Sequence, residues 1–381
     1  MGWLGTLTMA GLGLLSTLFV FAFGLVVLAI IVMFVIDVSQ THDAVRRNYP
    51  VIGRFRYLFS TLGEFFRQYF FAMDREEMPF NRAERDWVYK SASGADNTIA
   101  FGSTKNLNAV ETVIFVNCPF PTLDEHALPT PPVIFGPGAD QPYEAHSIIN
   151  VSGMSFGALS KPAVRALSKG AKLAGCWLNT GEGGLAPWHL EGGADVVFQM
   201  GTAKYGVRDD NGGLDEAKLR ELAAHPEVKM LELKMSQGAK PGKGGILPAE
   251  KVTEEIAGIR GIEAYKASIS PNRHPEIDNV SQLLDMIDRM RDVSGLPTGF
   301  KTVIGAYGWL DEMAEEIHRR GLAHAPDFIT VDSGDGGTGA APMPLMDNVG
   351  LPIREALPMV TDVLTRYGLR DRVKLVASGK L

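Results

Sequence analysis

The second half of the sequence repeats one pattern that limits the folds it can adopt. From about Ile148, short apolar runs end in stretches rich in Gly, Ser, Asn and Asp, and segments with helical periodicity follow at 161–174, 280–293 and 310–320. Strands and helices that alternate in this way are typical of a parallel α/β fold. A closed (β/α)8 barrel of the TIM type fits best, and a doubly wound sheet is the alternative. The apolar runs are INVSGMSFG, CWLNTGEGG, MLELKMSQG, ASISP, GFKTVIG, DFITVDSGDGGTG and VKLVASG.

The number of these units predicts an incomplete barrel. Seven strand–loop units can be counted, and the seventh, VKLVASG, lies at the end of the given sequence. We therefore expect a barrel truncated after its seventh strand, with an exposed edge where the eighth strand would pair. The expected organisation is a membrane anchor at 1–40, a connecting region at 41–145 that packs on the barrel, and the barrel itself at 146–381.

The start of the sequence predicts a transmembrane helix. Residues 1–36 contain no charged side chain, and a helix over 14–36 would span roughly 34 Å, enough for a hydrocarbon core of about 30 Å. A cleaved signal peptide has a shorter apolar core behind a basic start, and two short spans turning near Gly11 and Gly13 would need more chain. One uncleaved span in the cell membrane is therefore favoured. The positive-inside rule places the rest of the chain in the cytoplasm, because four arginines follow the span. They are Arg46, Arg47, Arg54 and Arg56.

The connecting region is irregular. The aromatic-rich stretch 57–73 is typical of an amphipathic helix, for which packing on its own protein is favoured over binding to the membrane. The stretch 117–138 holds six prolines and has no helical periodicity, so we expect an extended connector.

Composition excludes some classes of function. The chain has 37 Lys and Arg against 44 Asp and Glu and no long basic run, so general nucleic-acid binding is not expected. Its two cysteines, Cys118 and Cys176, cannot by themselves form a four-cysteine zinc site or ligate an iron–sulfur cluster. A metal site through Asp332 and Asp335 is disfavoured because no His accompanies them.

Three glycine-rich loops follow apolar runs, at the position where parallel α/β folds bind ligands. The loop at 179–184 holds Glu182 among three glycines, whose backbone can approach a flat or anionic ligand. The loop at 234–245 carries three lysines and Gln237, which suit a carboxylate or phosphate. Half of the residues in the loop at 332–339 are glycine, which suits a backbone nest around a cofactor. Taken alone, the first loop is also compatible with a tight turn that carries a solvated Glu, and the second with a basic surface loop.

Lys301 stands out because it lies inside the otherwise apolar run GFKTVIG. A lysine there needs a ligand or a carboxylate to offset its burial. It could stabilise negative charge on a reduced flavin, or it could extend its amine to water at the strand end.

Together these motifs resemble the FMN-binding synthase domain of glutamate synthases, in particular a membrane-anchored single-chain form of that family. The upstream stretches RNYPVIGRFRY and RQYFFAMDREEMPFNR are similar to the corresponding region of the single-chain form. The matching stretches of the barrel are SGMSFGALS (152–160), LNTGEGG (178–184), LKMSQGAKPGKGG (233–245), VDSGDGGTGAAP (331–342) and LRDRVKLVASGKL (369–381).

The resemblance implies a (β/α)8 barrel that binds FMN and converts 2-oxoglutarate and ammonia to L-glutamate, with hydride from reduced FMN. Gln237 and Lys240 would hold the substrate carboxylates, and Glu182 would lie near the site. The residues implied around the flavin ring are Met154, Ser155, Asn179, Thr180, Gln199, Lys234 and Lys301. Those implied around the ribityl and phosphate groups are Ser333, Gly334, Gly336, Gly337 and Gly379.

The sequence departs from the family in ways that concern its partners. The family's iron–sulfur cluster has no cysteines here, and the resemblance covers no glutaminase domain, so ammonia would be free or delivered by another protein. Electrons would come from ferredoxin or an NADPH-dependent protein. Two alternatives stay open: a transferase subunit similar to that of N-methylglutamate synthase, and a membrane-tethered FMN-binding module without turnover.

Overall fold

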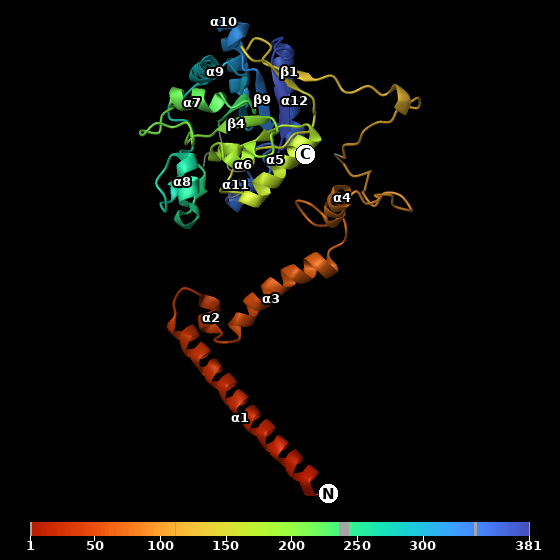
Figure 1. The fold of residues 1–381 in the computed structure, drawn as a ribbon, viewed down its shortest axis with the longest axis vertical. Coiled ribbons are helices and arrows are strands. Elements are labelled where there is room, and N and C mark those ends of the chain that lie inside the picture. Colours follow the sequence, from red (N-terminus) through yellow and green to blue (C-terminus); the bar gives the residue numbers. More distant parts are fainter. Residues whose placement is uncertain (1, 111, 236–243, 339–340, 381) are drawn as a thin grey trace. The chain divides into compact units, whose positions relative to one another are not determined.

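The computed structural model describes residues 2–110, 112–235, 244–338 and 341–380 (Figure 1). The chain folds as two units, Met1–Pro119 and Phe120–Leu381. The first is built from helices, and the second contains the strands.

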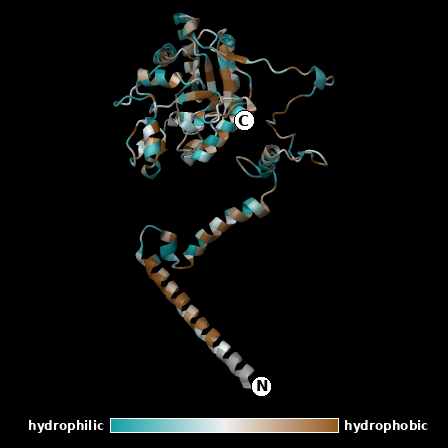
Figure 2. Cartoon of the chain, in the orientation of Figure 1, coloured by the Kyte–Doolittle hydropathy of each residue, from teal (hydrophilic) through white to brown (hydrophobic). Residues whose placement is uncertain are grey.

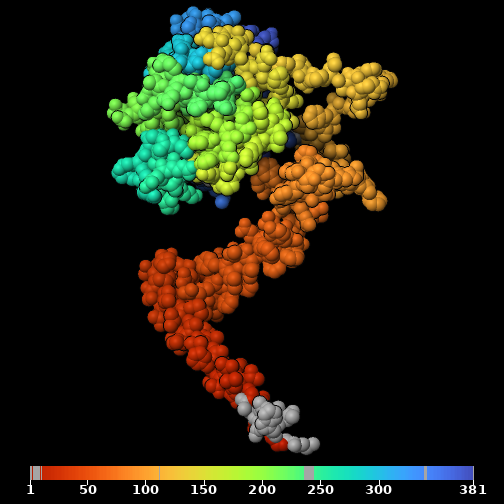
Figure 3. Space-filling model, viewed as in Figure 1, coloured from red at the N-terminus to blue at the C-terminus, as the bar shows by residue number. Residues whose placement is uncertain are grey.

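Helix α1 (Gly2–Ser39) is a long apolar helix with exposed side chains. The exposed fractions of Phe19 and Phe21 are 72% and 65%. Figure 2 colours most of the part of this helix that is not grey as hydrophobic, and Figure 3 shows the same stretch in red. Its stretch Gly11–Ser39 is long and apolar enough to cross a membrane, a test that a signal sequence also passes.

Asp37, near the end of α1, holds the segments that follow. Its buried carboxylate accepts hydrogen bonds from Arg46 Nη2 at 2.7 Å, Arg54 Nη2 at 2.8 Å and the backbone N–H of Val51 at 3.0 Å. We call this set the Asp37 clamp. The elements after α1 are α2 (Ala44–Asn48), α3 (Gly53–Phe66), a π-helical turn (Arg67–Phe71) and α4 (Arg82–Ser93).

The second unit contains a six-stranded parallel sheet in the order β10-β9-β8-β5-β4-β3. Val151 adds a single parallel bridge to Leu178 beside β3. The hydroxyl oxygens of Ser152 and Ser378, from the two edges of this sheet, lie 3.1 Å apart. The sheet is therefore a curved half-barrel, which is the part of the barrel prediction that the structure confirms. The strands are β3 (Leu178–Asn179), β4 (Val196–Met200), β5 (Val228–Lys234), β8 (Thr298–Val303), β9 (Phe328–Asp332) and β10 (Lys374–Ser378).

The predicted set of strands needs two corrections, one wrong assignment and one missing strand. The run ASISP is not a barrel strand, because β7 (Ser268–Ile269) pairs antiparallel with β6 (Ile246–Leu247) in a separate two-stranded sheet. The sequence pattern also missed β4, whose five residues are all buried and which has no glycine-rich run directly after it. The count of seven parallel segments is right only if the bridge at Val151 is included.

Helices pack on the outer face of the half-barrel (Figure 1). The predicted helices at 161–174, 280–293 and 310–320 are confirmed within two residues. The helices of this unit are α5 (Lys161–Ala174), α6 (Pro187–Leu190), α7 (Glu216–Ala223), α8 (Glu254–Arg260), α9 (Val280–Ser294), α10 (Gly308–Arg320), α11 (Met343–Met346) and α12 (Ile353–Arg366). Single 3-10 turns lie at Asp124–His126, Gly181–Gly183, Ala249–Lys251 and Leu322–His324.

Alternation along the strands divides the core into an outer and an inner part. On β5, Leu231 and Leu233 pack in the core that includes the helices, whereas Met230, Glu232 and Lys234 point to the other side of the sheet. The same period of two therefore places polar side chains inside the half-barrel.

A hairpin closes the amino ends of the strands. It pairs β1 (Val133–Phe135) with β2 (Tyr143–Ala145). The Phe135 ring packs edge-on against Trp177 and Phe328, with ring centroids 5.6 and 5.7 Å apart. We call this cluster the aromatic plug. Its buried residues are Phe135, Tyr143, Ala145, Trp177, Val197, Met230 and Phe328.

Candidate functional site

A buried carboxylate organises the polar layer directly above the aromatic plug. Glu232 on β5 is 2% exposed, and its Oε1 accepts hydrogen bonds from Gln199 Nε2 at 2.6 Å and Asn179 Nδ2 at 2.9 Å. Its Oε2 accepts a hydrogen bond from Thr330 on β9. These four residues form what we call the Glu232 cluster. Because the carboxylate only accepts, it fixes both amide groups with their N–H₂ toward Glu232.

Lys301 lies beside this cluster on β8. Its Nζ is 3.1 Å from Asp332 Oδ1 and 3.4 Å from the hydroxyl of Ser378. Ser378 in turn contacts Ser152. Lys301 is buried and has a carboxylate partner, so the expectation that burial must be offset is confirmed.

Lys234 and Glu182 form the next layer toward the carboxyl ends. Lys234 Nζ is 3.5 Å from Glu182 Oε2, and Lys234 is directly opposite Lys301 in the register of β5 and β8. Gly201 makes room for Glu182, because a Cβ at Gly201 would lie 2.6 Å from the Cβ of Glu182. Gly245 approaches the other side of the carboxylate, with a built Cβ 3.3 Å from Oε1.

A second group of buried polar residues lies behind Lys234. His274 is 1% exposed, and its Nε2 donates to the backbone oxygen of Lys234 at 2.9 Å. Its Nδ1 has no hydrogen-bond partner within the described ranges. Burial lowers the pKa of His274 to about 4, and the nearby Lys204 ammonium acts in the same direction. Lys204 is itself buried and pairs with Glu276 at 2.8 Å.

Two glycine loops meet at the ends of β9 and β10. A Cβ at Gly336 would lie 3.0 Å from the Cα of Gly379, and a Cβ at Gly379 would lie 3.1 Å from Ser333. A Cβ at Gly334 would lie 2.5 Å from the backbone of Gly350, whereas nothing lies within 4 Å of one at Gly337. The backbone therefore packs tightly on one side of this loop pair and is open at Gly337.

The remaining predicted residues lie in different surroundings. The hydroxyl of Thr180 is fully buried and bonds the backbone of Gly181 and Gln199. The side chain of Met154 packs against the core cluster beside α5, and Ser155 packs against Gly181. The backbone oxygen of Met154 contacts His189. Gln237 and Lys240 lie outside the described residues.

Several residues of this site escaped the sequence prediction. Glu232 carried a signal, because in the run LELK the acidic and basic residues at positions 232 and 234 share one face of a strand. Asp332 and Ser378 stood next to predicted residues but were not assigned as partners of Lys301. His274 had no local signal, since its contact is with a strand 40 residues away.

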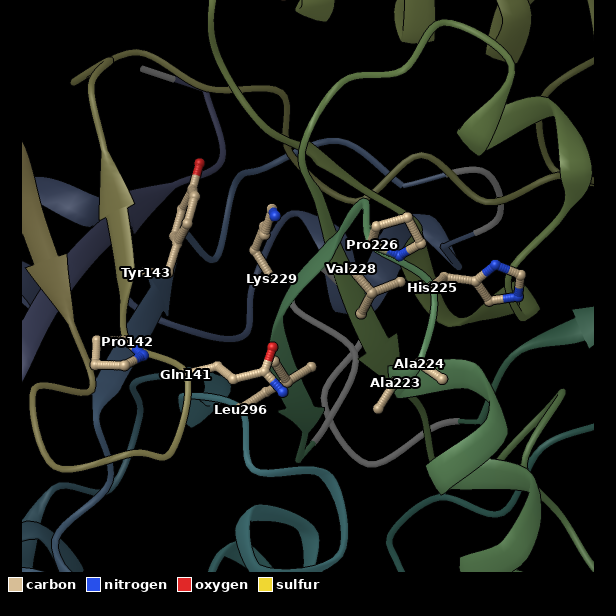
Figure 4. A pocket seen from close by; sticks show the side chains of 10 residues that line it. All are labelled: Gln141, Pro142, Tyr143, Ala223, Ala224, His225, Pro226, Val228, Lys229 and Leu296. Carbon is tan, nitrogen blue, oxygen red and sulfur yellow. The ribbon is translucent and has the colours of Figure 1, made fainter.

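The described residues contain no group of three His, Cys, Asp or Glu side chains that could hold a metal ion. Asp332 pairs with Lys301, and Asp335 pairs with Lys380 at 3.3 Å. A cavity of about 180 Å³ lies at the opposite end of the strands, near Tyr143, Val228 and Leu296 (Figure 4). None of the predicted site residues that the structure describes lines it.

Comparison with known proteins assigns the family. The family model described as a conserved region in glutamate synthase matches residues 133–381, which is more than half of the chain. The chain therefore belongs to the glutamate synthase family defined by that region.

Curated relatives agree with this assignment. The glutamate synthase large subunit-like protein YerD of Bacillus subtilis is 37% identical over 410 residues, covering 97% of this chain and 77% of its own length. An archaeal-type NADPH glutamate synthase of Dehalococcoides mccartyi is 35% identical over 230 residues, 60% of this chain. This chain covers only 42% of that second relative. Among solved structures, morphinone reductase aligns over 66% of this chain and 87% of its own at 13% identity and a TM-score of 0.29, which is too low to support an argument.

Proposed function

We propose that this protein is a flavin oxidoreductase that reductively aminates 2-oxoglutarate to L-glutamate. The observation that carries the proposal is the convergence of two cations, Lys234 and Lys301, with the amides held by the Glu232 cluster, beside the glycine loop pair. Cations and fixed amide groups at strand ends suit an electron-accepting ring and an anionic substrate. Membership of the glutamate synthase family, which typically binds FMN, selects the cofactor.

The described residues fit FMN in two respects. The open backbone at Gly337, beside the close contact of Gly336 with Gly379, would receive the phosphate and ribityl groups, together with Ser333 and Gly334. Asn179, Gln199, Lys234 and Lys301 would line the ring, with Met154, Ser155 and Thr180 contributing mainly through backbone positions. When bound, FMN would supply the hydride.

The substrates account for the other side chains. Ammonia and 2-oxoglutarate condense to 2-iminoglutarate with loss of water, and one hydride and one proton then give L-glutamate. Gln237 and Lys240 would hold the two substrate carboxylates, and Glu182, held by Lys234, would lie where ammonia arrives. Reoxidation of the cofactor requires an electron donor, which we propose to be ferredoxin or an NADPH-dependent protein.

The test is a titration of bound-flavin absorbance with 2-oxoglutarate. Loss of one charge-assisted contact to a desolvated carboxylate costs about 1.5–3 kcal/mol, or roughly 10- to 150-fold in affinity. Lys240→Ala should weaken keto-acid binding by that factor and leave FMN bound. Lys301→Met should instead disturb FMN binding or its reduction potential. Lys266→Ala is the control, because Lys266 is an exposed lysine paired only with Glu263 among the described residues. Wild-type keto-acid affinity in Lys240→Ala would refute the substrate role.

We also propose that α1 anchors the protein in the cell membrane, with the half-barrel in the cytoplasm. The support is the uncharged exposed surface of α1 and the arginines after it. An inserted helix resists alkaline carbonate extraction, so the protein should stay in the membrane pellet. Recovery in the supernatant would contradict the anchor.

A further inference from the structure

We propose that helix α3 lies on the surface of the bilayer that α1 enters, with one side in the boundary between headgroups and acyl chains. This inference rests on the proposed insertion of α1. The 14-residue helix carries apolar side chains spaced three and four residues apart, which gives one continuous apolar side. We call this side the α3 stripe. It consists of Phe55, Leu58, Phe59, Leu62, Phe65 and Phe66.

The α3 stripe is exposed to solvent in the described structure. The exposed fraction of Phe59 is 64%, and even the least exposed member, Leu62, is 39% exposed. The opposite side of the helix carries polar residues such as Ser60 and Glu64. A contiguous apolar surface with a polar back marks an interaction site rather than an ordinary surface. Packing on its own protein, which the sequence favoured, is the alternative that the experiment below distinguishes.

The charge of this region favours a lipid partner. Residues 37–73 contain five arginines and three acidic side chains, and three of the arginines lie outside the Asp37 clamp, although the whole chain has a net charge of −7. Basic residues beside an aromatic apolar side are typical of helices that lie in the membrane interface and contact anionic headgroups. Aromatic residues are also enriched at that depth.

The Asp37 clamp sets the depth of α3. It joins the last turn of α1 to Arg46 of α2 and to Arg54 in the first turn of α3. Gly53 makes close packing on α2 possible, because a Cβ there would lie 3.0 Å from the backbone oxygen of Val45. An inserted α1 would end at the membrane surface, so the clamp would start α3 at the same level.

The apolar surface continues beyond α3 into the π-helical turn. Phe70 and Phe71 are 66% and 73% exposed. The helix alone is about 21 Å long, so together they offer an extended strip parallel to a surface rather than a single anchoring residue.

The experiment uses the full chain reconstituted in liposomes of zwitterionic and anionic lipids. In a Cys118→Ser background, which keeps the buried Cys176, a single cysteine is introduced by Phe59→Cys on the stripe or by Ser60→Cys on the opposite side. Each is labelled with the same environment-sensitive fluorophore. Quenching is measured with lipids doxyl-labelled near the headgroup and with aqueous iodide. We expect several-fold stronger doxyl quenching at position 59 than at position 60, and the reverse order with iodide.

Alkaline extraction of the same liposomes separates failure of this inference from failure of the anchor. Retained protein whose two labels are equally open to iodide and unaffected by doxyl lipid would overturn the surface position of α3 while α1 stays inserted. Labels shielded from both quenchers would show that α3 packs on protein, which also overturns it. Protein lost on extraction would overturn the anchor, and this inference with it.

Discussion

The two ends of the half-barrel interior differ in chemistry although the same strands build both. At the amino ends, the aromatic plug fills the interior with Phe135, Trp177 and Phe328. Two residues further along the same strands, the interior becomes polar with the Glu232 cluster, and Lys234 and Lys301 add charge beside it.

Charged groups are also present at the amino end, where they pair with one another and with the backbone. Asp327 is 1% exposed and accepts hydrogen bonds from Arg291 Nε at 3.1 Å and the backbone N–H of Thr298 at 2.9 Å. Arg372 lies 3.0 Å from the same carboxylate. These groups tie the β8 and β9 strand starts to α9, whereas the carboxyl-end groups surround an open loop pair. We therefore predict that the amino end stabilises the fold and that the carboxyl end binds ligand.

The strongest test of this contrast removes the carboxylate at the amino end. Asp327→Ala leaves Arg291 and Arg372 without their buried partner, so the free energy of unfolding should fall by about 3–5 kcal/mol. Chemical denaturation in detergent measures this loss. Asp285→Ala is the matched control, because Asp285 pairs with Arg320 but is 62% exposed, and should cost less than about 1 kcal/mol. Equal effects of the two variants would contradict a stabilising role for the buried site.

The next test concerns acid sensitivity at the carboxyl end. Since burial lowers the pKa of His274 to about 4 from 6.5, the unfolded state binds the proton first as the pH falls. Stability should therefore be complete above pH 6.5 and decline down to about pH 4, by roughly 3 kcal/mol from this group. Burial also lowers the pKa of His189, which acts in the same direction.

The variant His274→Gln isolates this contribution. It keeps a donor for the backbone oxygen of Lys234 but cannot take up the proton, so unfolding free energy should depend less steeply on pH between 6.5 and 4. Denaturation curves at a series of pH values provide the measurement. His225→Gln changes an exposed histidine and should retain the wild-type slope. Parallel pH profiles for wild type and His274→Gln would contradict the assignment.

The sequence predicted the local parts of this molecule better than the contacts between them. Helical periodicity gave α5 its observed ends, and the glycine loops at 179–184 and 332–339 do follow strands of the sheet. The run ASISP misled because a short apolar stretch ending at a proline has the same local pattern in a barrel strand as in a small antiparallel pair. Strand β4 was missed because no glycine-rich run follows it at once.

The candidate site shows the same limit. Lys301 was recognised from its apolar neighbours alone, but its partners come from β9 and β10. The role of Glu232 could not be predicted, because its hydrogen-bond donors are amides on β3 and β4 and a hydroxyl on β9. The sequence does not show how these three strands align with β5. The register in which the strands pair brings these side chains together.

The last test asks whether the Glu232 cluster serves the fold or the ligand. A carboxylate accepts from Asn179, Gln199 and Thr330 at once, whereas the amide of Glu232→Gln brings one donor into a place surrounded by donors. The side chain has the same size, so the amides should turn away from their present positions without leaving a cavity. If those amides contact FMN, its dissociation constant should rise about tenfold, equivalent to about 1.4 kcal/mol. Flavin fluorescence on adding FMN to the apoprotein measures the affinity, and thermal unfolding of the apoprotein measures stability. The control is Glu216→Gln, because the Glu216 side chain is exposed and its ion pair with Arg289 lies on the surface. A lower unfolding temperature with unchanged FMN affinity would assign Glu232 to the fold, and the division between the two ends of the half-barrel would then have to be placed closer to Lys234.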